Sequence, residues 1–230
     1  MEIRNFDDFT AALLEAGFSV GGADNEVFSL LPYSWNNTPE GWPVRWHTGD
    51  AATDPWEWRM RVLEERDDIA YGKVFFRKSG YITRAWYPSF LAARRQGREF
   101  DEIYADGEMS HAAKRIYTTV QANGALPMHA VKQLGGFAKE DAARFDRAVV
   151  DLQMKLYLTL CGRRQKRSKT GEEYGWSSTV LCTTEDFWGQ EVFDEAARLS
   201  PQEGADRIAQ QVLRLNPQAK PKKLEKFIWG

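Results

Sequence analysis

Two side chains that can move a proton lie close together in a stretch rich in tryptophan. His47 and Asp50 both belong to the segment WHTGD, and an imidazole or a carboxylate can act as a general acid or base. Indole rings stack well on planar groups. The residues expected to form the walls of a pocket around the pair are Trp46, Trp56, Trp58 and Arg59. The stretch therefore predicts a pocket for a planar ligand, with Asp50 and His47 as its catalytic residues.

Each of these polar residues also has a structural interpretation. Asp54 fits the N-cap of a helix, with Glu57 completing a capping box. Asp50 follows Gly49 and suits a tight turn, and His47 could be a structural histidine. The spacing of His47, Asp50 and Asp54 matches no recognised metal-ligand pattern, so neither a metal nor another cofactor is predicted.

A second group of residues suits contact with phosphate. The segment CGRRQKRSKTG is basic and is expected at the tip of a β-hairpin, where its side chains could reach a DNA backbone. Its cationic residues are Arg163, Arg164, Lys166, Arg167 and Lys169. If all of them bound phosphates, the salt dependence of affinity would have a log–log slope of about −4 to −5. The alternative is a solvated loop whose charges serve solubility.

The helix expected before this hairpin carries Arg144 and Arg147, which could reach guanine edges in a major groove. Its charges cancel, because Glu140, Asp141, Asp146 and Asp151 offset Lys139, Arg144, Arg147 and Lys155. A neutral helix reads a groove poorly. A structural role or a protein-binding role therefore stays open for this helix.

Basic character also gathers between Lys73 and Arg98, where aromatic residues interleave with lysine and arginine and no acidic residue occurs. This pattern suits backbone tracking combined with base stacking. It equally suits a hairpin whose aromatic residues form core while its arginines reach solvent.

The elements that must position these residues are clearest between Ser110 and Cys182. Ser110 is a good N-cap for a first helix, and Asn123-Gly124 and Gly135-Gly136 end the first and second helices. A third helix follows, with an apolar stripe at Phe145, Ala148, Val149 and Leu152. Leucine then alternates with other residues, as in a half-buried strand, and the chain is expected to turn at 168–171 and return. Three helices followed by a hairpin predict a winged helix-turn-helix.

The flanking parts predict an α+β extension before this unit and helices after it. Nine tryptophans in the chain suggest a thick aromatic core, a stacking surface, or both. The expected N-terminal elements are a helix capped by Asn5, a packed irregular loop at 32–54, a helix at 55–65, strands at 69–76 and 81–86 joined by a turn at 78–80, a short helix from Pro88, and an acidic connector at 99–108.

The length of 230 residues allows one large domain or two small ones. The predicted regions are an N-terminal α+β region with the Trp-rich loop and hairpin at 1–108, a winged-helix domain at 109–190, and a C-terminal helical segment packed on the core at 191–230. The formal net charge is −2, so any nucleic-acid binding must depend on local patches.

The two cysteines are expected on neighbouring strands but not opposite each other. A turn centred on Thr170 places Cys161 opposite Thr179 and away from Cys182, so no disulfide is expected and a reducing compartment is the default. No signal-like segment and no membrane-length apolar run occurs. A cytoplasmic location without membrane contact is therefore expected.

Several strings of residues resemble one family. The strings WHTGDAATDPWEWR, AYGK, YITRAWYPSF, LQMKLYL, GWSSTV and TTEDFWG look like those of the AlkZ-related proteins, bacterial chains similar to the alkylpurine DNA glycosylases built from winged-helix domains. The resemblance extends from about residue 28 to residue 188, and it implies winged-helix architecture and a link to DNA repair. Those glycosylases direct water at the sugar with a Gln-x-Gln or Gln-x-Asp motif, and neither motif occurs here. Any such catalysis would fall to Asp50, Glu57 and His47.

The sequence therefore favours a winged-helix protein that contacts the backbone of duplex DNA through a basic wing, with a link to DNA repair. One alternative is a glycosylase-like enzyme that excises damaged bases, and a second is a non-catalytic protein-interaction module. Duplex DNA is the expected partner, a protein partner stays open, and the oligomeric state is not predicted.

Overall fold

The computed structural model describes residues 2–23, 26–167 and 172–230, and the side chains of 166, 167 and 173–176 lie outside that description. In chain order the elements are α1 (Phe6–Ala16), β1 (Phe18–Val20), α2 (Pro55–Glu65), β2 (Ile69–Phe75), β3 (Lys78–Thr83), α3 (Tyr87–Arg95), α4 (Phe100–Ala105), α5 (His111–Asn123), β4 (Leu126–Pro127), α6 (Met128–Leu134), the 3-10 helix η1 (Lys139–Asp141), α7 (Ala142–Met154), β5 (Leu158–Arg167), β6 (Glu173–Thr183), α8 (Thr184–Trp188), α9 (Gln190–Ala197), α10 (Pro201–Leu215) and α11 (Pro221–Trp229). The predicted α+β class is confirmed.

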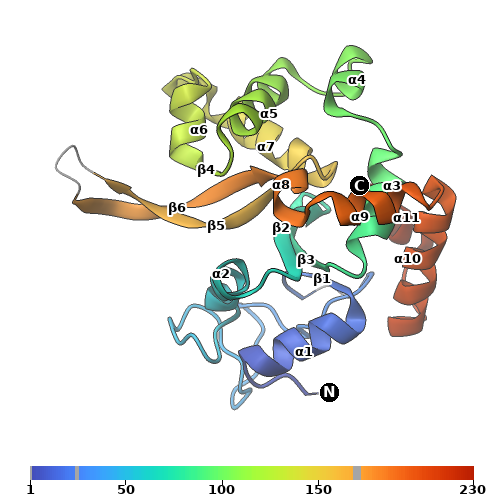
Figure 1. The fold of residues 1–230 in the computed structure, drawn as a ribbon. Helices are drawn as coiled ribbons and strands as arrows, with labels where there is room; N and C mark the ends of the chain where they lie inside the picture. Colours follow the sequence, from blue (N-terminus) through green and yellow to red (C-terminus); the bar gives the residue numbers. More distant parts are fainter. Residues whose placement is uncertain (1, 24–25, 168–171) are drawn as a thin grey trace.

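A single antiparallel sheet connects the N-terminal and central parts of the chain. Its strand order is β1-β3-β2-β5-β6-β4. The N-terminal hairpin joins the later strands where Tyr71 of β2 lies opposite Leu160 of β5. Beyond this junction, β5 and β6 continue as a two-stranded ribbon that projects from the body of the molecule (Figure 1). The sheet therefore crosses the predicted boundary at residue 108.

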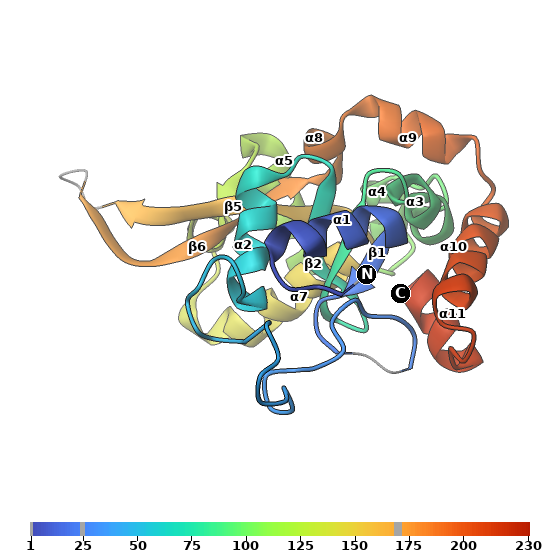
Figure 2. The same ribbon diagram turned by 90° about the horizontal axis from the view of Figure 1, so that it is seen from below.

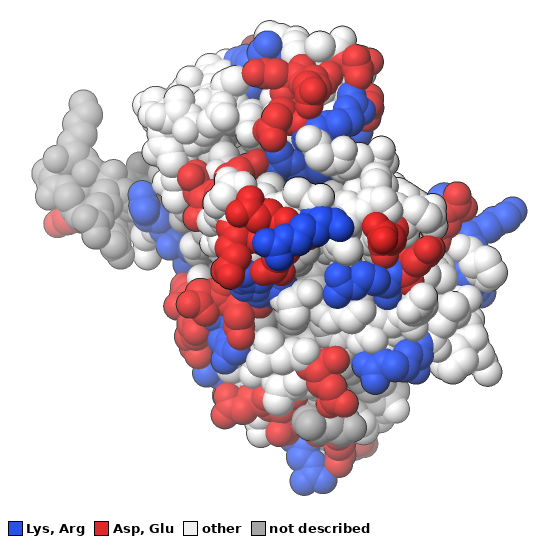
Figure 3. All heavy atoms as spheres, turned by 45° about the vertical axis from the view of Figure 1, so that its right-hand side comes forward, with Lys and Arg blue, Asp and Glu red and all other residues white. Residues whose placement is uncertain are grey.

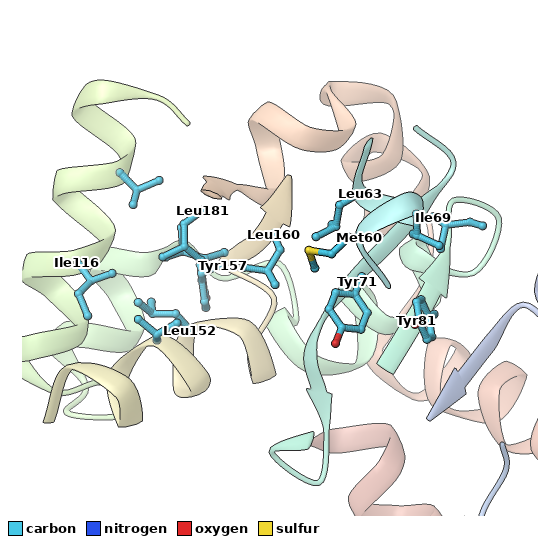
Figure 4. Packing of buried hydrophobic residues seen from close by; sticks show 14 of the residues in the cluster. Met60, Leu63, Ile69, Tyr71, Tyr81, Ile116, Leu152, Tyr157, Leu160 and Leu181 are labelled. Carbon is cyan, nitrogen blue, oxygen red and sulfur yellow. The ribbon is translucent and has the colours of Figure 1, made fainter. Parts of the chain in front are cut away.

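Two hydrophobic cores lie along this sheet. In the larger core, helices α5 and α7 and helices α1 and α2 contribute side chains from opposite sides of the sheet, as the views in Figures 1 and 2 show. Met60, Tyr71 and Leu160 meet there from three different elements (Figure 4). The smaller core lies between β1–β3 and helices α3, α10 and α11, where the rings of Phe75 and Phe227 stack 4.0 Å apart.

Side-chain caps start several helices where the sequence predicts them. Asn5 Oδ1 accepts a hydrogen bond from the Asp8 N–H at 2.9 Å, and Ser110 Oγ accepts one from Ala113 at 3.1 Å. Such caps satisfy backbone N–H groups that have no partner within the helix. Pro127, directly before α6, is extended and pairs with Val180 in the sheet.

The turn of the N-terminal hairpin lies two residues before its predicted position. The chain reverses at Phe76 and Arg77, which both have positive φ angles (52° and 62°). Gly80 is a strand residue there, and the ring of Phe75 occupies the space of its missing side chain, 2.3 Å from an ideal Cβ. The prediction of a turn at 78–80 is therefore wrong, because this glycine makes room for an aromatic ring.

Two other details of the sequence interpretation are corrected. The acidic connector contains a helix, α4, which a capping box between Glu99 and Glu102 begins. In the ribbon, Cys182 lies opposite Thr159, and Thr179 lies opposite Arg163. The predicted pairing of Cys161 with Thr179 is wrong because the register shifts between residues 160 and 163; both cysteines are free thiols.

Among the described residues, no helix has both the length and the apolar character needed to cross a bilayer.

Candidate nucleic-acid interface

The Trp-rich loop is fixed to the body of the protein by one buried carboxylate. Asp54 is fully buried, and its Oδ1 accepts the Trp56 N–H at 2.8 Å as the N-cap of α2. Its Oδ2 accepts the N–H groups of Thr48 and Gly49 at 2.7 and 3.0 Å. The predicted cap at Asp54 is confirmed. The predicted capping box is not formed, because the Asp54 carboxylate accepts from Trp56 and from the loop, and Glu57 does not complete the motif.

Asp50 belongs to an exposed turn in the same loop. Its Oδ2 accepts the hydroxyl of Thr53 at 2.6 Å, and its Oδ1 accepts the Ala52 N–H at 3.0 Å. These hydrogen bonds, with that of Thr53 the stronger, lower the pKa of Asp50. A carboxylate with a lowered pKa is a weaker base. The geometry therefore gives Asp50 a turn-forming role.

His47 and two of the predicted pocket residues form a small exposed stack. The imidazole of His47, whose backbone φ is 61°, lies 4.9 Å from the ring of Trp56. The guanidinium of Arg59 lies 3.3 Å from the centre of the same ring, and its Nε donates to the Trp56 carbonyl. Trp56 therefore holds Arg59 in one position at the start of α2.

The remaining two tryptophans are packed inward. Trp58 is fully buried, stacks on Phe9 at 5.1 Å, and donates its indole N–H to the Ala52 carbonyl. Trp46 is half-buried against the larger core. Trp58 is therefore a core residue and does not line an open pocket.

The basic ribbon is described only at its base. Arg163 and Arg164 are exposed on β5, and Arg163 pairs with Glu64 of α2, with 2.5 Å between its Nε and the carboxylate. Lys169 lies outside the described residues, and the side chains of Lys166 and Arg167 do as well. Contact between the ribbon tip and phosphate therefore stays a prediction.

Helix α7 presents its two arginines to solvent. Arg144 pairs with Asp141 at 3.1 Å, whereas Arg147 has no carboxylate partner among the described residues. On a helix, residues three apart are neighbours. Arg147 therefore lies beside Val150, which brings it to the edge of the cleft described next.

A cleft of about 270 Å³ lies between α2 and α7. Residues of α2, α6 and α7 and of strands β2, β3, β5 and β6 line it. Met60, Tyr71 and Leu160 supply apolar surface, and Figure 4 shows these three side chains converging from their separate elements. A concave, partly apolar space with a few polar groups is the usual form of a small-ligand site.

Two cations in this cleft are not neutralised. Arg59 and Lys73 both line it, and no carboxylate of the described residues pairs with either. The one acidic residue of the lining, Asp146, already faces Lys132 at 3.6 Å. Arg163 lies opposite Thr179, another residue of the cleft, but it is paired with Glu64 and adds no free charge. The cleft is therefore a positively charged site with apolar walls.

Gln153 connects α7 to strand β2 at this site. It is 2% exposed, its Oε1 accepts the backbone N–H of Lys73 at 2.8 Å, and its Nε2 donates to the Val149 carbonyl at 3.2 Å. The amide of Gln153 lies where a side chain at Gly72 would begin, because a Cβ there would lie 2.8 Å from Gln153 Oε1. The side chain therefore sets the position of Lys73 relative to α7.

Of the predicted site residues whose side chains the structure describes, only Arg59 lines this cleft. Tyr71 and Gln153 are not predicted as site residues, and Lys73 is predicted only as part of a basic-aromatic stretch. That stretch and the prediction of Arg59 as a pocket residue are the sequence signals that lead to the cleft. Among the described residues, no group of three His, Cys, Asp or Glu side chains could hold a metal ion.

The face of the molecule shown in Figure 3 carries charges of both signs. On the face shown in Figure 3, acidic and basic side chains are intermixed, without a continuous basic area. A strongly basic field is the usual mark of a surface that binds nucleic acid. That face therefore lacks the mark of an extended nucleic-acid interface.

These features define a mixed α+β protein with a charged cleft where its two halves meet. The chain belongs to the AlkZ-related family, since the family model described as AlkZ related matches residues 3–229. No curated protein and no solved structure matches the chain.

Proposed function

We propose that this chain binds duplex DNA through the side that carries the cleft and the base of the ribbon, as a winged-helix protein linked to DNA repair. The order α5, β4, α6, α7, β5, β6 supports the winged-helix interpretation, because β4 pairs with β6 and the β5–β6 ribbon takes the place of the wing. Membership of the AlkZ-related family supports the link to repair.

The cations around the cleft carry this proposal. Arg59 comes from α2, Lys73 from β2 and Arg147 from α7, and none of them has a carboxylate partner among the described residues. When unpaired cations on one side of a protein bind DNA phosphates, the counterions condensed on the DNA are released. That release supplies most of the affinity for a duplex. Because the charges of the α7 side chains sum to zero, we expect this helix to contact the DNA backbone and not to read base edges.

A binding assay with matched charge reversals tests the proposal. Fluorescence anisotropy of a labelled duplex, measured over a series of KCl concentrations, gives the affinity and its salt slope for the wild type. The double variant Arg147→Glu/Arg164→Glu should bind at least about tenfold more weakly, with a log–log slope smaller by about 2. Both side chains are exposed, so the fold should survive.

The control is Arg198→Glu/Lys222→Glu, which changes the net charge equally. These two exposed residues belong to the end of α9 and to α11, far from the ribbon (Figure 1). The control should keep wild-type affinity and slope. Equal weakening in both double variants would show that only net charge matters and would remove the proposed interface. Absence of binding at low salt, with a co-purifying protein, would favour the interaction-module alternative.

Base excision receives no geometric support at the residues predicted for it. The Asp50 carboxylate is bonded within its turn, and Trp58 is buried in the core. The test is release of free base from a panel of alkylated duplexes, with Asp50→Asn as the comparison. Release that the substitution abolishes would restore Asp50 as a catalytic residue.

A further inference from the structure

We infer that the cleft between α2 and α7 holds one unpaired deoxynucleotide of the bound DNA, with Lys73 and Arg59 contacting its phosphate. This inference rests on the proposed binding of DNA and adds a particular ligand to a particular site. The steps that lead to it are the size of the cleft, the chemistry of its walls and the charges it contains.

The size of the cleft suits one nucleotide base and excludes a helix. A space of about 270 Å³ is at the small end of ligand pockets. A base that is stacked and paired within a duplex cannot enter such a space without leaving the stack. Of the parts of a bound DNA, an unpaired or extruded nucleotide is therefore the one that can enter the cleft.

The walls suit a flat ring with polar edges. Met60 and Leu160 offer apolar contact, and the aromatic ring of Tyr71 lies between them and the other tyrosine of the hairpin, Tyr81 (Figure 4). A thioether makes favourable contact with aromatic rings. Thr179 also lines the cleft, and a threonine hydroxyl can donate to or accept from the polar edge of a base.

The charges suit a phosphate next to that ring. Within the described part of the chain, Arg59 uses only its Nε in a hydrogen bond, which it donates to the Trp56 carbonyl, so its terminal nitrogens are left for a ligand. Lys73 is exposed at its end while its backbone is fixed by Gln153. Cations that are held in place but unpaired favour a phosphate over a neutral ligand. An apolar cleft with a phosphate site beside it matches a nucleotide better than a free base.

Two ligands test the inference independently of duplex binding. Isothermal titration or NMR titration with dAMP should show saturable binding to the wild type, and deoxyadenosine, which lacks the phosphate, should bind more weakly. Lys73→Ala should reduce the difference between the two ligands, because it removes one of the two cations assigned to the phosphate. Lys78→Ala is the matched control, since it removes an exposed lysine from the same hairpin outside the cleft.

A second test uses DNA and compares the affinity for a duplex that has a single-nucleotide bulge with the affinity for the fully paired duplex. The wild type should prefer the bulged duplex by about tenfold, as expected from the stacking energy of one base. Thr179→Trp should fill the cleft and erase this preference while paired-duplex binding persists. Tryptophan suits a strand, and the circular dichroism of the variant would establish that it folds.

The outcomes separate this inference from the proposed function. Binding of paired duplex without dAMP binding and without a bulge preference would overturn the inference and leave DNA binding intact. A bulge preference that survives in both Lys73→Ala and Thr179→Trp would place the unpaired nucleotide elsewhere and would overturn it too. Failure to bind either duplex would remove the proposed function, and the dAMP titration would still decide whether the cleft takes a nucleotide.

Discussion

The guanidinium of Arg94 closes the carboxyl end of the last helix, because its Nε donates to the carbonyl oxygen of Ile228 at 2.8 Å. The same side chain donates to the carbonyls of Val74, Met154 and Phe227. It thereby joins β2 to the ends of α7 and α11, where the last carbonyls of a helix have no partner within it and favour a cation. Burial lowers the pKa of Arg94 to about 9, so the side chain remains charged at neutral pH.

Replacing Arg94 by methionine should therefore be strongly destabilising. The change leaves buried carbonyls without donors, and the free energy of unfolding should fall by about 3 kcal/mol or more. Urea denaturation followed by tryptophan fluorescence measures the loss. Arg198→Met, at an exposed position, should change stability by less than about 0.5 kcal/mol. Similar midpoints for the two variants would contradict the role given to Arg94.

Asp54 should matter more than its neighbour Asp50, although both are acidic residues of one loop. Asp54→Ala removes the cap of α2 and the acceptor of two loop N–H groups, so stability should fall by about 2 kcal/mol or more. Asp50→Ala affects only an exposed turn and should cost less. Chemical denaturation of the two variants compares them directly, and the reverse order would disprove this assignment.

Gln153 should control the backbone of Lys73 at the cleft. In Gln153→Leu, the Lys73 N–H loses its acceptor, and an unsatisfied buried group costs about 1–3 kcal/mol. Amide hydrogen exchange at Lys73 should become faster in this variant. Gln202→Leu, on the exposed side of α10, is the control and should leave that amide unchanged. Unaltered exchange in Gln153→Leu would mean that another group positions the strand.

Glu108 should contribute to stability only above acidic pH. Its carboxylate accepts hydrogen bonds from Lys155 and Arg98, which lower its pKa from 4.5 to about 2. Protonation therefore favours the unfolded chain, and the contribution is complete above pH 4.5 and is lost as the pH falls toward about 2. The melting temperature of Glu108→Gln should fall less over this range than that of the wild type. The control Glu15→Gln, at an exposed position of α1, should follow the wild type; an identical pH profile for Glu108→Gln would be inconsistent with this coupling.

Local signals in the sequence predict much of the fold. Caps such as Asn5, Asp54 and Ser110 mark helix starts because a side-chain acceptor must satisfy free N–H groups close by in sequence. After α7 the spacing of the apolar residues changes from helical to alternating, and this change likewise predicts β5. These features depend on residues within a few positions of one another, so the sequence alone reveals them.

The features that depend on distant residues could not be predicted in this way. Gly80 looks like a turn residue until the ring of Phe75 is found against it. The cleft combines Arg59, Lys73 and Gln153, which come together only when β2 pairs with β5. Asp50 looked catalytic because a carboxylate near an imidazole has that chemistry, but its partners within the turn are set by the folded loop.

The pairing of Tyr71 with Leu160 has a practical consequence for anyone dividing this chain. A fragment of residues 109–190 would lose the strand that covers β5, leaving a bare edge with Leu160 uncovered beside it. Exposed edges of this kind recruit further strands. Expressed alone, the fragment should therefore self-associate through β5, which makes insoluble material or oligomers the expected product of dissection.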